Sequence, residues 1–407
     1  MIHSKYCKPR IFPWNSVRQP EQIDRAQDIG GDLTLNREKQ YEIGREGVLA
    51  YKQGTPTFSY TMRQFENGDM ALFYDLANKA NPGSGEDHFV ELDDMQSTNF
   101  DIAAFLTDDN NTFSGTIFFP KLRVSGFTIN IGAPDAILER NFTLVGEDYK
   151  ILDEKYFSYQ TATKTGTGVL SMVLSPAAIE YAASTYIFKV LRIRAGVATE
   201  LINDQAGSPA DNTYKYVNGT ATLTVQTCAD GDVVKVYFPS ATAYTTLWAD
   251  NNVDAAFQLA ECCEVYMKVG TSERIYRLQS VGIDVTFDRT DYREIGNSEF
   301  VSFGVKSKTV TISLDRYAET FSLESILAGD PAYPYIDPRN FVDNIQILVK
   351  VFADKTHTAF KIGYLMTKAA PKTMATAQPV EDYMKRTTTL ECDNLKISDL
   401  ASELAFI

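Results

Sequence analysis

The chain has 407 residues, of which 44% are hydrophobic and 23% are charged, a composition typical of soluble globular proteins with two or three domains. Its 39 basic and 53 acidic side chains give a net charge of −14, which argues against tight binding of nucleic acid. It has no apolar run of the roughly 18 residues needed to span a membrane. The N-terminus lacks the apolar core of a secretion signal, so we expect synthesis in a cytoplasm.

Two stretches of the sequence, residues 25–44 and 277–296, resemble each other. Aligned without a gap, they agree at nine of twenty positions, where average composition predicts about one match. We expect the repeated arginines and acids to form ion pairs, either within the fold or across an interface. The repeat-defining residues are Arg25 and Arg277, Gly30 and Gly282, Asp32 and Asp284, Arg37 and Arg289, Glu42 and Glu294, and Gly44 and Gly296.

The same elements are predicted after each stretch. Polar and apolar residues alternate at 57–65 and 309–317, which predicts two strands with one wet face each. Short links are predicted to join them as hairpins to the apolar stretches at 48–51 and 300–303. The polar faces carry Ser59, Thr61 and Arg63 in the first copy and Thr311, Ser313 and Asp315 in the second.

Apolar residues at helical spacing predict a short helix after each strand, at 69–78 and 319–329. Two further strands around a polar turn are predicted at 100–122 and again at 344–366. A β-rich unit with one helix is therefore predicted twice, as a duplicated domain. The predicted boundaries are residues 1–24 for an N-terminal arm, 25–154 for the first unit and 251–407 for the second.

The segment between the two units, residues 155–250, has a different pattern. Stretches that alternate strongly, separated by Gly, Asn and Asp turns, predict a small antiparallel β-sandwich there. A short helix is expected within it at 174–184. The predicted fold class is thus mainly β with one helix per repeat (α+β), with duplicated barrel or sandwich units and a small sandwich domain.

Motifs of catalysis and of metal binding are absent from the sequence. The three histidines share no motif with a nucleophile or a carboxylate, and the five cysteines form no CxxC pair. Acidic loops at 81–94, 107–112 and 249–254 lack the spacing of a calcium-binding loop and are interpreted as solvated turns. We therefore expect no catalytic residue, no cofactor and no metal.

The stretch VSGFTINIGAPDAILERNFTLVGEDYKIL, residues 124–152, resembles the tail tube proteins of long-tailed bacteriophages. The SGFTINI strand and the FTLVG strand end carry the local likeness, and the order of elements in both copies extends it. The second copy departs from the pattern, with TTTLEC in place of the FTLVG strand end. The chain is similar to those members, from phages with non-contractile tails, that fuse two tube domains and carry an immunoglobulin-like domain, here 155–250.

The resemblance implies a structural virion protein of the phage tail, synthesised in the host bacterial cytoplasm. It implies homotrimeric rings that imitate a hexamer and stack around a lumen through which DNA is ejected. The implied partners are other copies of the chain, the tape measure protein, transiting DNA, and the tail terminator and baseplate proteins, with no sequence-specific binding of nucleic acid. Loops at 1–22, 79–99 and 329–343 are candidate contacts between rings.

An acidic lumen would repel DNA and keep friction low. The polar strand faces described above are candidates for that lumen, or equally for the outer surface. Two other functions stay open: a different duplicated tail component, such as a baseplate hub or tail completion protein, and a carbohydrate-binding adhesive β-sandwich protein. The second has thin support, because Trp14 and Trp248 lie far apart in the sequence.

Overall fold

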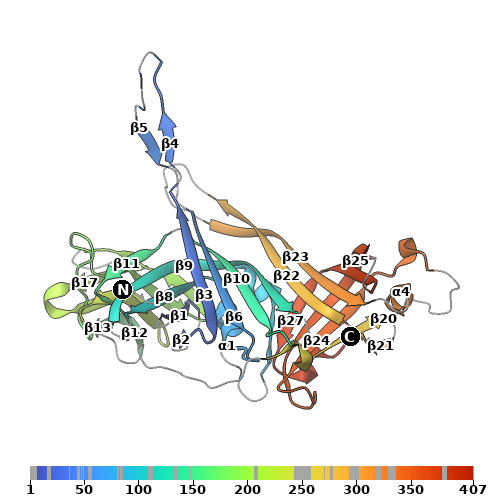
Figure 1. The fold of residues 1–407 in the computed structure, drawn as a ribbon. Helices are drawn as coiled ribbons and strands as arrows, with labels where there is room; N and C mark the ends of the chain where they lie inside the picture. The colour runs from blue at the N-terminus through green and yellow to red at the C-terminus, as the bar shows by residue number, and fades with distance from the viewer. Residues whose placement is uncertain are drawn as a thin grey trace.

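A computed structural model gives the fold of the chain, which is mainly β-sheet (Figure 1). Two β-rich units lie side by side, and a separate β-sandwich lies on the far side of the first unit from the second. The structure describes residues 7–15, 20–35, 37–43, 46, 48, 50–53, 57–79, 82, 86–108, 113–132, 135–146, 148–205, 210–242, 258–269, 271–275, 278–292, 302–317, 322–328, 336–377 and 383–406.

One antiparallel sheet, the main sheet, runs through both units. Within the described residues it has eight strands, and its order is β3 (Ala26–Thr34), β6 (Thr57–Phe65), β10 (Glu139–Gly146), β9 (Phe113–Ile131), β22 (Leu278–Tyr292), β23 (Ser302–Tyr317), β26 (Lys385–Cys392) and β25 (Phe360–Ala377). The first four strands belong to the first unit and the last four to the second. Alternation makes one face apolar and buried, so that Phe58, Tyr60 and Met62 are each at most 2% exposed.

The two halves of the main sheet have the same pairing. Gly30 lies opposite Thr61, and their counterparts 252 residues later, Gly282 and Ser313, also lie opposite each other. Each half also has a β-bulge at the corresponding place. In the first unit the extra residue lies between Val124 and Gly126 of β9, and in the second it lies between Pro371 and Thr373 of β25. The two units therefore share strand order, register and irregularities.

A smaller sheet packs behind the main sheet in each unit, and apolar side chains fill the space between the layers. In the first unit its order is β2 (Glu21–Gln22), β1 (Lys8–Pro13), β8 (Phe100–Thr107), the first half of β9, and β11 (Lys150–Asp153). In the second unit its order is β21 (Thr271–Arg274), β20 (Cys263–Val269), β24 (Ile345–Phe352), the first half of β25, and β27 (Asn394–Ser398). The long strands β9 and β25 each pass from one layer into the other.

Part of the predicted N-terminal arm forms strands of the first unit. Strand β1 pairs with β8 along six residues, and β2 pairs with β1. The second unit has the same arrangement, in which β20 pairs with β24 and β21 pairs with β20. Strand β1 reads KPRIFP, whose two prolines and missing alternation hid it from sequence analysis. Residues 1–6 lie outside the described part of the chain.

The two predicted helices are present and short. Helix α1 (Ala71–Leu76) and helix α4 (Ser322–Leu327) follow β6 and β23 at the corresponding place in each unit. The carboxylate of Asp69 accepts a hydrogen bond from the Ala71 amide (2.8 Å) and so satisfies one of the free amides at the start of α1. Buried Phe73 and Leu76 attach this helix to the core.

Each unit carries a long hairpin at one end of the main sheet. In the first unit β4 (Arg37–Gln40) and β5 (Ala50–Gln53) continue β3 and β6 outward, and they project from the body of the molecule (Figure 1). The predicted hairpin links were wrong, because β5 pairs with β4 and β23 runs unbroken through 305–308. That stretch, VKSK, contains no Gly, Pro, Asn or Asp, and extended strand geometry continues through it.

The segment between the units forms two described four-stranded sheets. One has the order β12 (Tyr156–Thr163), β19 (Val233–Ser240), β14 (Lys189–Arg194), β15 (Val197–Glu200), and the other β13 (Gly168–Val173), β18 (Thr222–Cys228), β17 (Thr213–Val217), β16 (Ile202–Asn203). The pairing in these sheets is antiparallel except between β16 and β17, which pair in parallel. The expected helix at 174–184 is wrong: the backbone there makes bends and isolated bridges, one of them to Ser240.

An aromatic cluster attaches the sandwich to the smaller sheet of the first unit. Phe118 of β9 stacks on Phe157 of β12, with ring centroids 4.5 Å apart. Lys189 forms a buried ion pair with Asp101 (2.5 Å), and its ammonium lies 4.3 Å from the Trp14 ring centroid. The sandwich therefore packs on the layer behind the main sheet and leaves the polar face of that sheet free.

Candidate assembly interface

The two units meet edge to edge in the main sheet. Six residues of β22, Val281 to Thr286, pair with six residues of β9, Ile131 to Gly126, in antiparallel register. The backbones approach closely, since a Cβ on Gly126 would lie 2.5 Å from the Val285 carbonyl oxygen. We call this pairing the internal joint.

A second layer of contacts supports the internal joint. Strand β7 (Phe89–Glu91) comes from the first unit but pairs with β27 of the second. Helix α2 (Leu92–Gln96) follows it, and Asp93 at its start forms an ion pair with Lys308 of β23 (2.7 Å). The loop 79–99, predicted as a contact between rings, thus contributes described elements that join the two units of one chain.

Arg289 is one of the repeat-defining arginines, and it bridges the two units. Its Nε donates to the Val124 carbonyl of β9 (2.6 Å), and its Nη1 donates to the Gln96 carbonyl at the end of α2 (3.0 Å). The sequence predicted a partner acid, whereas these partners are main-chain carbonyls. Its counterpart Arg37 is exposed on β4 and has no such contact among the described residues.

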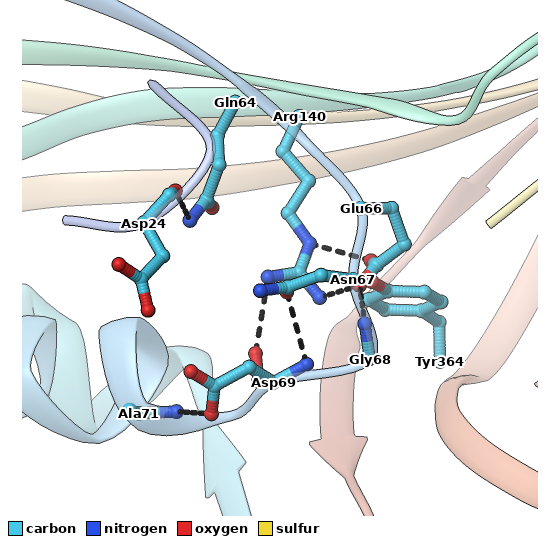
Figure 2. Close-up of polar contacts among 9 residues, drawn as sticks. All are labelled: Asp24, Gln64, Glu66, Asn67, Gly68, Asp69, Ala71, Arg140 and Tyr364. Carbon is cyan, nitrogen blue, oxygen red and sulfur yellow. Dashed lines mark hydrogen bonds and ion pairs between the residues drawn. The ribbon is translucent and has the colours of Figure 1, made fainter. Parts of the chain in front are cut away.

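A buried ion pair lies where the first unit meets the second (Figure 2). The Arg140 guanidinium donates to both carboxylate oxygens of Glu66, and both side chains are fully buried. The Tyr364 hydroxyl, from β25 of the second unit, also donates to Glu66. Further hydrogen bonds join the Gly68 amide to Glu66 (2.7 Å) and Arg140 to the Asp69 carbonyl (3.2 Å). Every charge in this group therefore has partners, which such deep burial requires.

The ionisation of this group follows from its surroundings. Burial acts to lower the pKa of Arg140, but the Glu66 carboxylate outweighs this and holds that pKa above its ordinary value. Burial also raises the pKa of the Tyr364 hydroxyl well above its ordinary value, which keeps it a hydrogen-bond donor. The second unit thus contributes a fixed donor to an ion pair of the first.

The second unit has its own version of the ion pair. Arg386, the counterpart of Arg140, binds Glu324 of helix α4 together with Arg316. Burial acts to raise the pKa of the Glu324 carboxyl, but the hydrogen bonds from Arg386 and Arg316 outweigh it and hold the pKa below its ordinary value. The arginine is repeated, whereas the acid comes from a different element in each unit.

The main sheet ends in two edges within the described residues. Strand β3 pairs with β6 on one side, and its other side is open. At the far end, residues 370–377 of β25 pair with β26 on one side, and no described strand lies on the other. Residues 375–377 are exposed. Unpaired edges of this kind are templates for pairing with another chain.

The predicted polar strand faces form one continuous surface. Ser59, Thr61 and Arg63 are exposed on β6, and their counterparts on β23 share the same face of the main sheet, partly exposed. Neighbouring strands add mostly hydroxyls and acids to it, including Asp28, Asp32, Thr143, Thr128, Asp284, Asp288, Thr389 and Glu391.

The remaining repeat-defining residues are placed unevenly. Gly30 and Gly282 lie on the polar face of the main sheet, with Asp32 and Asp284 two residues along. Thr286 donates to the Asp284 carboxylate (3.2 Å), and Arg25 has a positive φ of 56° at the start of β3. Glu42 is exposed beyond β4. The predictions for Gly44, Arg277, Glu294 and Gly296 fall outside the described residues.

The polar chemistry of the described residues offers no metal site, since they contain no group of three His, Cys, Asp or Glu side chains close enough to hold one. His88 lies beside Asp399 (3.4 Å) and His357 beside Glu264 (3.2 Å), each with a single acid. His3 and the acidic loop 249–254 lie outside the described residues. In the part of the chain that the structure describes, no helix is both long and apolar enough to cross a membrane.

No protein-family model and no curated protein matches the chain. Among solved structures, it is similar to a chain of an extracellular contractile injection system, the PVC sheath-tube complex in the extended state (16% identity, 39% of this chain and 99% of that one, TM-score 0.28). It is also similar to the tube-terminating cap of the anti-feeding prophage (16%, 39% and 100%, TM-score 0.29) and to the SPP1 tail tube (11%, 37% and 87%, TM-score 0.27). At such scores, the likeness alone assigns the chain no function.

Proposed function

We propose that the protein is a structural subunit of a phage tail tube, in which three copies close a ring and rings stack around a lumen for DNA. The observation that carries the proposal is the main sheet, in which two units of equal topology join edge to edge and leave one open edge at each end. A joint that recurs between chains would close the sheet and leave no unpaired edge.

The size of such a ring suits its role. Three chains with eight main-sheet strands each would form a barrel of 24 strands (three times eight). With strands about 4.8 Å apart and tilted by about 40°, that barrel would be roughly 50 Å across between backbones. Side chains would narrow this bore and still leave room for a DNA duplex.

The layers of the fold support one orientation in this ring. The apolar face of the main sheet is covered by the smaller sheets, and the sandwich packs behind one of them. We therefore assign the polar face, with Ser59, Thr61, Arg63, Thr311, Ser313 and Asp315, to the lumen, and the sandwich, as an immunoglobulin-like decoration, to the outside. Most of these side chains carry hydroxyls or carboxylates, which offer DNA phosphates no attractive counter-charge. The exception, Arg63, lies 3.6 Å from the Glu139 carboxylate.

Contacts between rings are assigned to the projecting hairpin. Ile43, beyond the end of β4, is fully exposed, and Tyr41 is 67% exposed. Exposed apolar side chains at the end of a projection are typical of a surface that another protein covers. In this account the hairpin of one ring reaches the next ring, and the tape measure protein, terminator and baseplate proteins meet the tube at its lumen and ends.

Electron microscopy of the purified full-length protein at increasing concentration tests the function. Hollow rings with threefold symmetry, and tubes built from them, are the expected result. Particles that stay single at every concentration, and that bind immobilised glycans, would instead indicate an adhesive protein and overturn the proposal.

A further inference from the structure

We propose that the open edge of β3 binds residues 374–377 of β25 from a second copy of the chain, in the register of the internal joint, and that Arg37 clamps this contact as Arg289 clamps the internal one. The inference rests on the ring proposed above and specifies the interface between its subunits. We call this interface the external joint.

The internal joint supplies the register. In it, the run from Gly282 to Val285 pairs with the run from Asn130 back to Phe127. The equal pairing of the two units identifies the counterparts of these residues in β3 and in β25. The external pairs are then Gly30 with Ala377, Gly31 with Thr376, Asp32 with Ala375, and Leu33 with Met374 of the neighbouring copy.

Side chains at the open edges are more exposed than their counterparts in the internal joint. Val281 and Val285, which lie in the internal joint, are 3% and 1% exposed. Their counterparts Ile29 and Leu33 on β3 are only half-buried, although they face the same core. A neighbouring strand would complete the burial of these side chains, as β9 does for β22.

Arg37 supplies a polar contact of the external joint. Arg289 donates to the carbonyl of Val124, whose counterpart in β25 is Pro371. Arg37 occupies the place of Arg289 one repeat earlier, opposite Gln53 where Arg289 is opposite Val305. In the external joint, the Arg37 guanidinium therefore donates to the Pro371 carbonyl of the neighbouring copy.

The two joints differ in two places, so the strand edges of one joint do not fit those of the other. Thr373 stands where the internal joint has Gly126, whose close approach leaves no space for a Cβ. The external ladder therefore ends at Met374, and the long Arg37 side chain spans the wider gap beyond it. The residue of the first unit that corresponds to Tyr364 is Ile117. Because isoleucine has no hydroxyl, a contact like that of Tyr364 with Glu66 forms only in the internal joint.

Disulfide trapping tests the register in assembled full-length protein. The variant Asp32→Cys with Ala375→Cys places the two thiols on residues directly opposite each other, within the roughly 4.4–6.8 Å between Cα atoms that a disulfide spans. Mild oxidation is expected to yield covalent trimers on a denaturing, non-reducing gel. The matched control, Asp32→Cys with Ala377→Cys, moves one thiol by two residues and should remain mostly monomeric. Asp32→Cys alone measures any reaction with the native cysteines, of which Cys7 and Cys263 are half-buried and the other three are buried.

Substitution of Arg37 tests the clamp. Because this side chain is exposed, Arg37→Ala should leave the melting temperature of the monomer unchanged. It should raise the protein concentration needed for ring assembly about tenfold. For a trimer this is a roughly 100-fold fall in the association constant, or about 2.8 kcal/mol over the three joints of a ring. Glu38→Ala, next to it and also exposed, is the control and should assemble as the wild type does.

The outcomes separate this inference from the proposed function. Rings in which the Asp32 and Ala377 variant is trapped instead, or in which Arg37→Ala assembles normally, overturn the external joint and leave the tube intact. Absence of rings from the wild-type protein overturns the proposed function, and the external joint with it.

Discussion

The Tyr364 hydroxyl donates a hydrogen bond to Glu66, which lies 298 residues earlier in the chain and in the other unit (Figure 2). Glu66 is already paired with Arg140, so the contact ties the second unit to a charged group that cannot tolerate loss of a partner. The internal joint is thereby held both by its strand ladder and by a buried polar group.

Tyr364→Phe is expected to destabilise the protein by about 1–3 kcal/mol, because a buried carboxylate loses a hydrogen-bond donor. Urea unfolding followed by circular dichroism measures the change. Tyr51→Phe, at an exposed tyrosine of the hairpin, is the control and should change stability very little. Equal stability of Tyr364→Phe and wild type would show that the hydroxyl does not support the joint.

Gly126→Ala is expected to push β9 and β22 apart, because the new Cβ would lie 2.5 Å from the Val285 carbonyl oxygen. The expected loss is about 1–3 kcal/mol, together with faster hydrogen exchange at the amides of 281–286. Gly282→Ala is the matched control in the same joint, since a Cβ there meets nothing within 4 Å. If the two variants behave alike, the close approach at Gly126 is not a constraint.

Glu324→Gln is expected to lose about 3–5 kcal/mol at neutral pH, because Arg316 and Arg386 keep their charges without the carboxylate. The pKa of Glu324 is lowered in the folded state, so its stabilising effect is complete above its unfolded pKa of about 4.5 and is lost as pH falls through the folded value. The stability gap between wild type and variant should therefore shrink below about pH 4.5. Glu38→Gln, in an exposed ion pair, should show almost no gap at any pH. A Glu324→Gln gap that stays constant down to pH 3 would contradict the assignment.

Ser59→Lys combined with Thr311→Lys is expected to make assembled tubes bind DNA at low salt, because it adds two positive charges per chain at corresponding places on the polar face. Fluorescence anisotropy with a short labelled duplex measures binding, which should weaken steeply as salt is added. The variant with glutamine at the same positions is the uncharged control. If the lysine tubes bind DNA no better than the glutamine tubes, the polar face does not line the lumen.

Ile43→Ser is expected to leave single rings intact and to shorten the tubes, because it removes the fully exposed apolar side chain of the projecting hairpin. Tube length distributions in electron micrographs measure the effect. The control is Val197→Ser, an exposed apolar residue of the sandwich, which should leave tube length unchanged. Tubes of normal length from Ile43→Ser would place ring-to-ring contact elsewhere.

Alternation of polar and apolar residues predicted the strands that have one exposed and one buried face. The alternation at 57–65 predicted β6 with the bounds that the structure has, because one wet face and one buried face impose a period of two. The same alternation at 309–317 predicted a strand, which forms part of β23. Strand β1 escaped notice, because its burial comes from neighbours on both sides and leaves no alternation in KPRIFP.

The polar contacts of the interface could not be predicted in the same way. Glu66 and Arg140 lie 74 residues apart, and the corresponding arginine of the second unit takes its acid from helix α4 instead. Arg289 was identified as repeated, but its partners are main-chain carbonyls, which have no signature in a sequence. Such contacts follow from the packing of the units and not from any local pattern.

The most direct measurement of the central claim is a cryo-EM map of one assembled ring, with each chain traced. The account predicts three chains of 45.5 kDa per ring, with β25 of each chain beside β3 of the next and the polar face of the main sheet toward the hole. Six chains per ring, or units that meet through any other edge, would contradict it.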